Sequence, residues 1–165
     1  MPGTDVPIPR EAVRAILIDG KGRTLLFKAF ASRDRLRHFW ITPGGGIAAG
    51  ESDATALRRE LAEECGLHRF DIGPMVWIRD VLFPHPETGQ MLQQQERFYL
   101  VRIDSHEVDI SGWDELERVF MTEPRWWTLD ELAAAQESFA PRELPRHLGD
   151  LVRGHVPVEP IDVSG

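Results

Sequence analysis

The chain has 165 residues, 42% of them apolar, so it is long enough for one domain with a sizeable core and too short for two comfortable ones. Its 27 acidic residues exceed its 19 basic residues, and the formal net charge of −8 disfavours general binding to long nucleic acids or anionic membranes. We therefore expect a single domain over residues 1–165 that binds any phosphate-bearing ligand locally.

The sequence predicts a soluble, cytoplasmic protein without a membrane partner. Its first residues lack a basic region followed by an apolar core, and no run approaches 18 consecutive apolar residues. Cys65 is the only cysteine, which favours a reducing compartment and a buried structural thiol. The proline-containing termini, residues 1–9 and 156–165, are the segments most prone to disorder.

The first elements in the chain are predicted to be strands. Residues 12–19 and 24–30 are rich in apolar side chains and flank a glycine turn, so we expect an antiparallel hairpin. Residues 39–41 suit a short strand. Residues 42–46 contain a proline followed by three glycines and predict a loop.

A helix is expected next, over about 53–65. Ser52 or Asp53 can accept hydrogen bonds from the free amides at the start of this helix, and Gly66 suits a left-handed end. Apolar residues within it recur at helical spacing and predict a buried stripe.

The following segment predicts a second pair of strands. Residues 72–83 and 91–103 are rich in β-branched and aromatic side chains and flank a strong turn signal at 84–89, so two long antiparallel strands fit. Residues 104–123 suggest an acidic loop, and 125–127 a last strand.

Two further helices are expected near the C-terminus. The capping-box pattern at 128–131 opens one, and residues 144–152 suit the other. Strands and helices are mixed without a regular βαβ rhythm, so the predicted fold class is α+β.

Three glutamates share one face of the helix predicted over 53–65. Glu60, Glu63 and Glu64 lie at positions i, i+3 and i+4 and project from neighbouring points. Each like-charged pair costs roughly a few tenths of a kcal/mol on a bare helix, and a divalent cation that prefers oxygen ligands would reverse this penalty. The pattern predicts a Mg²⁺ or Mn²⁺ site, with a solvated helix face as the simpler alternative.

The same segment resembles the Nudix box, G-x5-E-x7-R-E-U-x-E-E-x-G-U, in which U is aliphatic. Every fixed position between 45 and 67 is matched, by Gly45, Glu51, Arg59, Glu60, Leu61, Glu63, Glu64, Gly66 and Leu67. A chance match has a probability of about 10⁻⁹ to 10⁻¹⁰ per starting point. The resemblance implies a Nudix α/β/α sandwich with a mixed central β-sheet. It also implies metal-dependent hydrolysis, by water attack at phosphorus, of a nucleoside diphosphate linked to another moiety.

The resemblance also implies roles for individual residues. The ligands of Mg²⁺ or Mn²⁺ would be Glu60, Glu63, Glu64 and the backbone carbonyl of Gly44. Arg59 would orient the glutamates by charge-assisted hydrogen bonds. Glu51 would either hold a metal through water or brace the glycine loop.

The motif does not identify the general base, because family members take it from a box glutamate or from a distant loop. Glu63 or Glu64 is the first choice here. Glu117 and Glu123, in the predicted acidic loop, are further candidates, although solvated loop charges are the commoner explanation for such residues.

Substrate selection must come from outside the box. Basic residues gather just before the glycine loop, at Lys28, Arg33, Arg35, Arg37 and His38. Of these, Arg35, Arg37 and His38 are candidates to grip a second phosphate or a terminal ribose, although a basic loop is more often a solvated surface. Aromatic residues of the long strands could stack a base but are more often core: Trp77, Phe83, Phe98 and Tyr99.

Two classes of function stay open. The first is a pyrophosphohydrolase for a small-molecule nucleotide such as ADP-ribose, a nucleotide sugar, a nucleoside triphosphate or a dinucleoside polyphosphate. The second is a non-catalytic nucleotide sensor or interaction module with the same fold, which a missing box glutamate would favour; none is missing. An isoprenoid diphosphate isomerase finds no support in the sequence. A homodimer is the commonest association for such domains.

Overall fold

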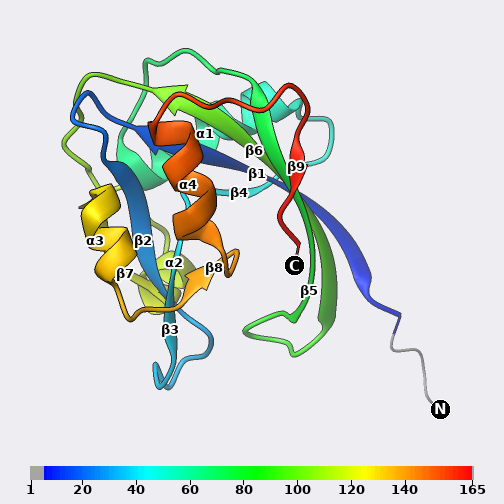
Figure 1. The fold of residues 1–165 in the computed structure, drawn as a ribbon. Coiled ribbons are helices and arrows are strands. Elements are labelled where there is room, and N and C mark those ends of the chain that lie inside the picture. The colour runs from blue at the N-terminus through cyan, green and yellow to red at the C-terminus, as the bar shows by residue number, and fades with distance from the viewer. Residues whose placement is uncertain (1–5, 165) are drawn as a thin grey trace.

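The structure, a computed structural model, describes residues 6–164. Within this range the chain forms one mixed sheet of nine strands and four helices (Figure 1). The strands are β1 (Ile8–Ile18), β2 (Thr24–Phe30), β3 (His38–Ile41), β4 (Gly44–Gly46), β5 (Met75–Pro84), β6 (Met91–Arg102), β7 (Met121–Trp127), β8 (Phe139–Ala140) and β9 (Ile161–Asp162). The helices are α1 (Asp53–Cys65), α2 (Glu115–Phe120), α3 (Leu129–Ala134) and α4 (Leu144–Val152).

The sheet combines parallel and antiparallel pairs, in the order β8-β3-β2-β1-β6-β5-β9, with β4 on β1 and β7 on β2. The central strand β1 runs parallel to β6 along its full length, from Ile8 opposite Leu92 to Ile18 opposite Arg102. It runs antiparallel to β2, so the hairpin predicted at 12–30 is confirmed. A mixed sheet with helices is the α+β arrangement expected from the sequence.

The sheet buries side chains on both faces. Along β1, Val13 and Leu17 pack in one cluster with α1, whereas Ile16 and Ile18 pack in a second cluster with α3 and α4. This alternation follows from the two-residue period of a strand. Helix α1 therefore covers the face opposite to α3 and α4, which gives the predicted three-layer sandwich (Figure 1).

Helix α1 begins and ends where the sequence predicts. The Ser52 side chain accepts a hydrogen bond from the Thr55 amide, and Gly66 ends the helix in the left-handed region with φ of 68°. Cys65 is fully buried in the cluster beneath this helix, so the prediction of a buried thiol is confirmed.

Two predicted loops are wrong. Residues 44–46 form β4, which pairs antiparallel with β1. The pairing requires glycine, because a Cβ at Gly44 would lie 2.2 Å from the carbonyl oxygen of Val13. Residues 104–123 are not all loop: α2 spans 115–120 and β7 starts at Met121, where it adds to β2.

The prediction of disorder at the termini fails in part. Ile8 and Pro9 belong to β1, and Ile161 and Asp162 form β9 beside β5, followed by a buried Val163. The sequence did not reveal this pairing because two residues carry too little pattern to predict a strand. Residues 1–5 and 165 lie outside the described residues.

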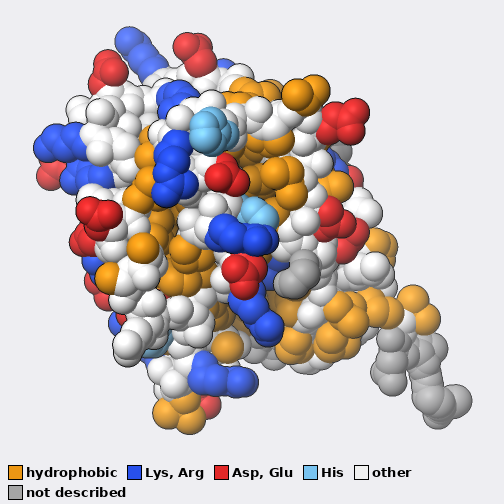
Figure 2. Space-filling model, viewed as in Figure 1, with side chains coloured by type: hydrophobic (Ala, Val, Ile, Leu, Met, Phe, Trp, Pro, Cys, Tyr) orange, Lys and Arg blue, Asp and Glu red, His pale blue; other side chains and the backbone are white. Residues whose placement is uncertain are grey.

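The surface on the side viewed in Figure 2 mixes acidic and basic side chains and shows no continuous basic patch. Hydrophobic side chains are exposed where β1 projects from the body, and Val6 and Ile8 there are 73% and 48% exposed. Between residues 6 and 164, no helix has the length and apolar content to cross a membrane.

Candidate metal and nucleotide site

The site begins where β4 meets α1. A Cβ on Gly45 would lie 2.6 Å from a carboxylate oxygen of Glu60, so the missing side chain leaves the space that this carboxylate occupies. The amide of Gly44 donates to Oε1 of Glu64 at 3.2 Å. The glycine strand and the carboxylate face of the helix are therefore in direct contact.

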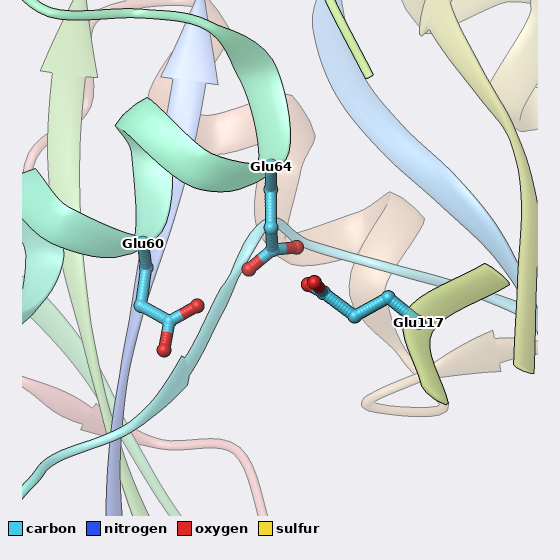
Figure 3. A group of neighbouring side chains, drawn as sticks. All are labelled: Glu60, Glu64 and Glu117. Atoms are coloured by element: carbon cyan, nitrogen blue, oxygen red, sulfur yellow. The ribbon is translucent and has the colours of Figure 1, made fainter. Parts of the chain in front are cut away.

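Three carboxylates converge at this contact. Glu60 and Glu64 extend from successive turns of α1, and Glu117 reaches toward them from α2 (Figure 3). Each offers an oxygen within 4.8 Å of the others, and Glu60 and Glu64 are only 9% and 2% exposed. A tight group of carboxylate oxygens fits a hard cation such as Mg²⁺ or Mn²⁺.

The electrostatics of the cluster favour a cation. Burial, followed by the hydrogen bond and charge of Glu60, raises the pKa of Glu64 well above its usual range. Burial also raises the pKa of Glu117, and the charges of Asp114, Glu60 and Glu63 add to this shift. The pKa values rise because close carboxylates in a desolvated space repel one another when they are charged. The positive charge of a divalent cation would offset this repulsion.

Arg59 connects three parts of the site. Its Nε and Nη2 donate to both carboxylate oxygens of Glu51, at 2.8 and 2.7 Å, while Nη2 also donates to the carbonyl of Gly46 and Nη1 to Glu60. The hydrogen bonds from Arg59 and then from the Ala48 amide lower the pKa of Glu51 to about 2. Of the two roles left open for Glu51, this geometry supports the bracing of the loop.

Glu63 lies apart from the three converging carboxylates. Its side chain is 48% exposed, and its carboxylate lies 3.7 Å from Nη1 of Arg59. It nevertheless lines the same cavity as Glu60 and Glu64. Glu63 is thus a half-exposed carboxylate of the cavity lining, paired with Arg59 and separate from the cluster.

The cavity over these carboxylates has a volume of about 420 Å³, within the range of small-molecule sites. The segments that complete it come from the sheet, from α2 and from the β5–β6 turn. Residues outside the box that line it include Arg10, Arg14, Ile41, Phe83, His85, Pro86, Gln94, Leu116, Glu117 and Phe120. A larger cavity of about 540 Å³ lies beside Arg23 and Trp126, and none of the box glutamates lines it.

A buried charge network lies beside the cavity. Glu96, only 2% exposed, accepts hydrogen bonds from Arg14 at 2.7 Å, Arg79 at 2.8 Å and Gln94 at 2.8 Å. Burial alone would raise the pKa of Glu96, but Arg14 and Arg79 outweigh it and lower that pKa to about 2. Arg14 also donates to the carbonyl of Thr42, so the network reaches the segment that leads into β4.

The structure does not bring the predicted basic residues to the cavity. Arg35 donates to the carbonyls of Arg118 and Val119 at the end of α2, and Nε2 of His38 lies 2.7 Å from Oε2 of Glu137. Within residues 6–164, none of Arg35, Arg37 and His38 lines the cavity. The basic loop therefore packs against the protein at these contacts.

The two candidate bases from the predicted acidic loop, Glu117 and Glu123, lie in different places. Glu117 joins the cluster, whereas Glu123 lies on β7, outside the cavity lining, with its carboxylate 3.6 Å from Nζ of Lys28. A capping box holds Glu117, because its carboxylate accepts from the Asp114 amide while Asp114 accepts from its amide. The D-x-x-E spacing of residues 114–117 was the signal in the sequence for this helix start.

The aromatic residues divide in the same way. Trp77 and Phe98 are buried in the cluster against α4, and Tyr99 donates its hydroxyl to Asp53. Phe83 lines the cavity. Of the aromatic residues considered for base stacking, Phe83 is the one that the structure places at the site.

A family model described as the NUDIX domain matches residues 8–148. An RNA pyrophosphohydrolase of Teredinibacter turnerae is 30% identical over 155 residues, which cover 88% of this chain and 86% of the relative. An RNA pyrophosphohydrolase of Actinobacillus succinogenes is 29% identical over 109 residues, covering 61% of this chain and 53% of the relative. For several such relatives the chain spans only 53 to 60% of their length.

Solved structures show the same fold. The MutT protein of Methanosarcina mazei has a TM-score of 0.63 at 19% identity, covering 88% of this chain and 96% of that chain. A UDP-X diphosphatase has a TM-score of 0.60 at 14% identity and covers 95% and 68%. An Ap4A hydrolase of C. elegans has a TM-score of 0.57 at 17% identity and covers 87% and 98%. The Nudix sandwich predicted from residues 45–67 is thus confirmed, and the chain belongs to the NUDIX domain family.

Proposed function

We propose that this protein is a divalent-metal-dependent pyrophosphohydrolase that cleaves a nucleoside diphosphate linked to another moiety. The observation that carries the proposal is the convergence of Glu60, Glu64 and Glu117 in the lining of a cavity large enough for a nucleotide. The similar proteins include RNA pyrophosphohydrolases, a UDP-X diphosphatase and an Ap4A hydrolase. These names all indicate cleavage of a phosphoanhydride bond but differ in the nucleotide, so they support the reaction class.

The metal ligands in this proposal are the carboxylates of Glu60, Glu64 and Glu117. Glu63 and the carbonyl of Gly44 complete the set implied by the Nudix box. When bound, Mg²⁺ or Mn²⁺ would neutralise phosphate charge and make an attacking water more acidic. Arg59 keeps Glu60 oriented through its hydrogen bond at 3.0 Å.

Two side chains of the cavity suit the substrate and the attacking water. Arg10 lines the cavity beside Gly46, and between residues 6 and 164 its guanidinium has no hydrogen bond or ion pair, so it can bind phosphate oxygens. Glu63 is our first choice for the base that accepts a proton from the attacking water, and its half-exposed position in the cavity lining, apart from the carboxylate cluster, supports this role. Glu117 is the alternative base, in which case Glu63 would take its place among the metal ligands.

The experiment that tests the proposal is a hydrolysis screen of the purified protein with Mg²⁺ or Mn²⁺. The panel holds ADP-ribose, nucleotide sugars, nucleoside triphosphates, dinucleoside polyphosphates and an RNA oligonucleotide with a 5′-triphosphate, and products are separated by chromatography. We expect metal-dependent cleavage at a phosphoanhydride in one class, with EDTA abolishing the products. Binding without turnover across the panel would instead support the non-catalytic sensor.

The RNA oligonucleotide belongs in the panel for a specific reason. The sequence relatives are RNA pyrophosphohydrolases, whereas the net charge of −8 disfavours general attraction to a long RNA backbone. A small nucleotide is therefore the substrate that we propose. Preferential cleavage of the RNA end over every small nucleotide would contradict this choice while leaving the reaction class intact.

A further inference from the structure

The turn between β5 and β6 holds His85 in one tautomer at the cavity. Its Nδ1 accepts hydrogen bonds from the backbone amides of Glu87 at 3.1 Å and Thr88 at 3.3 Å. A ring nitrogen that accepts carries no hydrogen, so the hydrogen of the neutral imidazole is on Nε2. Within residues 6–164 this Nε2–H has no acceptor, and His85 lines the cavity. The turn therefore leaves one hydrogen-bond donor of a cavity-lining side chain available to a ligand.

Several of the residues that line the cavity with His85 are apolar. Phe83, two residues before it, and Pro86, directly after it, line the same cavity, and α2 contributes Leu116 and Phe120 beside the acidic Glu117. Phosphate oxygens are better matched near β4 by Arg10 and by the cation that the carboxylates there would hold, because burying an anion against apolar groups is costly. A flat ring is the ligand part that suits aromatic and apolar side chains.

Contacts from other segments brace the turn. The amide of His85 donates to the carbonyl of Gln90 at 2.8 Å. Glu87 forms an ion pair with Arg33, whose guanidinium lies over the Phe120 ring, 5.7 Å from its centroid. The turn, the loop before β3 and α2 are thus joined, and contacts from outside the turn help to hold the segment that carries His85.

We propose that His85 determines base specificity by donating a hydrogen bond from Nε2 to an acceptor on the nucleobase edge. This inference rests on the proposed function, since it places the phosphates at the carboxylates and the base between the β5–β6 turn and α2. Every nucleobase carries oxygen or ring-nitrogen acceptors, but in different positions. One donor on a braced turn would therefore favour one base over the others.

Two substitutions of His85 separate this role from a role in the turn. In His85→Asn, the side-chain oxygen can replace Nδ1 as acceptor for the amides of Glu87 and Thr88, but no donor remains at the position of Nε2. In His85→Gln, the side-chain amide can replace the Nε2 donor, but the acceptor for the turn is lost. The two variants thus remove opposite halves of the imidazole.

The measurement is kcat/KM for ATP, GTP, CTP and UTP with Mg²⁺, after the melting temperature of each variant has been recorded. We expect His85→Asn to lower kcat/KM for the preferred base by about 3- to 10-fold, the size of one hydrogen bond, mainly through KM. The least preferred base should change little, so the selectivity ratio flattens. His85→Gln should keep the ratio of the wild-type protein.

Three outcomes would overturn the role of His85. The first is that His85→Asn keeps the selectivity ratio while His85→Gln loses it. The second is that His85→Asn lowers kcat/KM equally for all four bases. The third is a selectivity ratio near one in the wild-type protein. If the wild-type protein hydrolyses none of the four, the proposed function fails for these substrates, and calorimetric binding of their α,β-methylene analogues decides the role of His85 by the same criteria. Failure of the wild-type protein to bind any analogue would overturn the role as well.

Discussion

Replacing Glu96 with glutamine should destabilise the protein, because the carboxylate holds two buried arginines. Folding lowers the pKa of Glu96 from 4.5 to about 2. One pKa unit corresponds to about 1.36 kcal/mol, so the environment favours the charged form by about 3 kcal/mol. The side chains of Arg14 and Arg79 are only 16% and 18% exposed and would lose their partner. We expect Glu96→Gln to lower the free energy of unfolding at pH 7 by about 3 kcal/mol.

The assay is urea unfolding of both proteins from pH 7 to pH 2. Because folding lowers this pKa, the contribution of Glu96 is complete above the unfolded value near 4.5 and is lost as the pH falls through about 2. The difference between the wild-type protein and Glu96→Gln should therefore shrink over this interval. The control is Glu11→Gln. The Glu11 side chain is 58% exposed and forms an ion pair with Arg97, so this substitution should lower the free energy of unfolding by less than about 1 kcal/mol. A small difference at pH 7, or one that does not change with pH, would refute the reasoning.

Three other predictions concern the site. Gly45→Ala places a Cβ 2.6 Å from the Glu60 carboxylate and should lower kcat at least 10-fold with little change in melting temperature. Gly50 has a φ of 80° and no neighbour within 4 Å of an added Cβ, so Gly50→Ala should lower the melting temperature and leave kcat nearly unchanged. The Arg35 guanidinium contacts backbone carbonyls, so Arg35→Ala should lower the melting temperature and leave KM for nucleotides unchanged. A raised KM would show that Arg35 binds the substrate after all. Since burial raises the pKa of Glu64, Mg²⁺ binding should release protons, which calorimetry in buffers of different ionisation enthalpy would detect, and binding without proton release would contradict this.

Local signals in the sequence explain what could be predicted. The start and end of α1 depend on Ser52 and Gly66, which lie next to the helix and act through their own hydrogen bonds and backbone angles. The start of α2 had a signal of the same kind in Asp114 and Glu117, but the acidic composition around it resembled a loop. The convergence of Glu60 and Glu64 was predictable because they lie four residues apart on one helix face, whereas Glu63 lies apart from them.

Contacts between distant residues explain what was not predicted. Three glycines normally favour a loop, and only the close approach of β1 makes them a strand. The carbonyls that bind Arg35 lie more than 80 residues after it in the chain. Glu96, which binds Arg14, likewise lies more than 80 residues after Arg14. Phe83 and His85 reach the cavity because β5 is long enough to carry its turn there. The spacing of a motif does not contain such contacts.

The central claim is that the carboxylate cluster binds a divalent metal on which hydrolysis depends. The most direct test is Mn²⁺ binding by electron paramagnetic resonance for the wild-type protein and Glu64→Gln, with hydrolysis measured in the same samples. We expect the substitution to weaken Mn²⁺ binding at least 10-fold and to lower kcat at least 100-fold while the protein stays folded. Unchanged Mn²⁺ affinity in folded Glu64→Gln, or hydrolysis that persists in EDTA, would contradict the account.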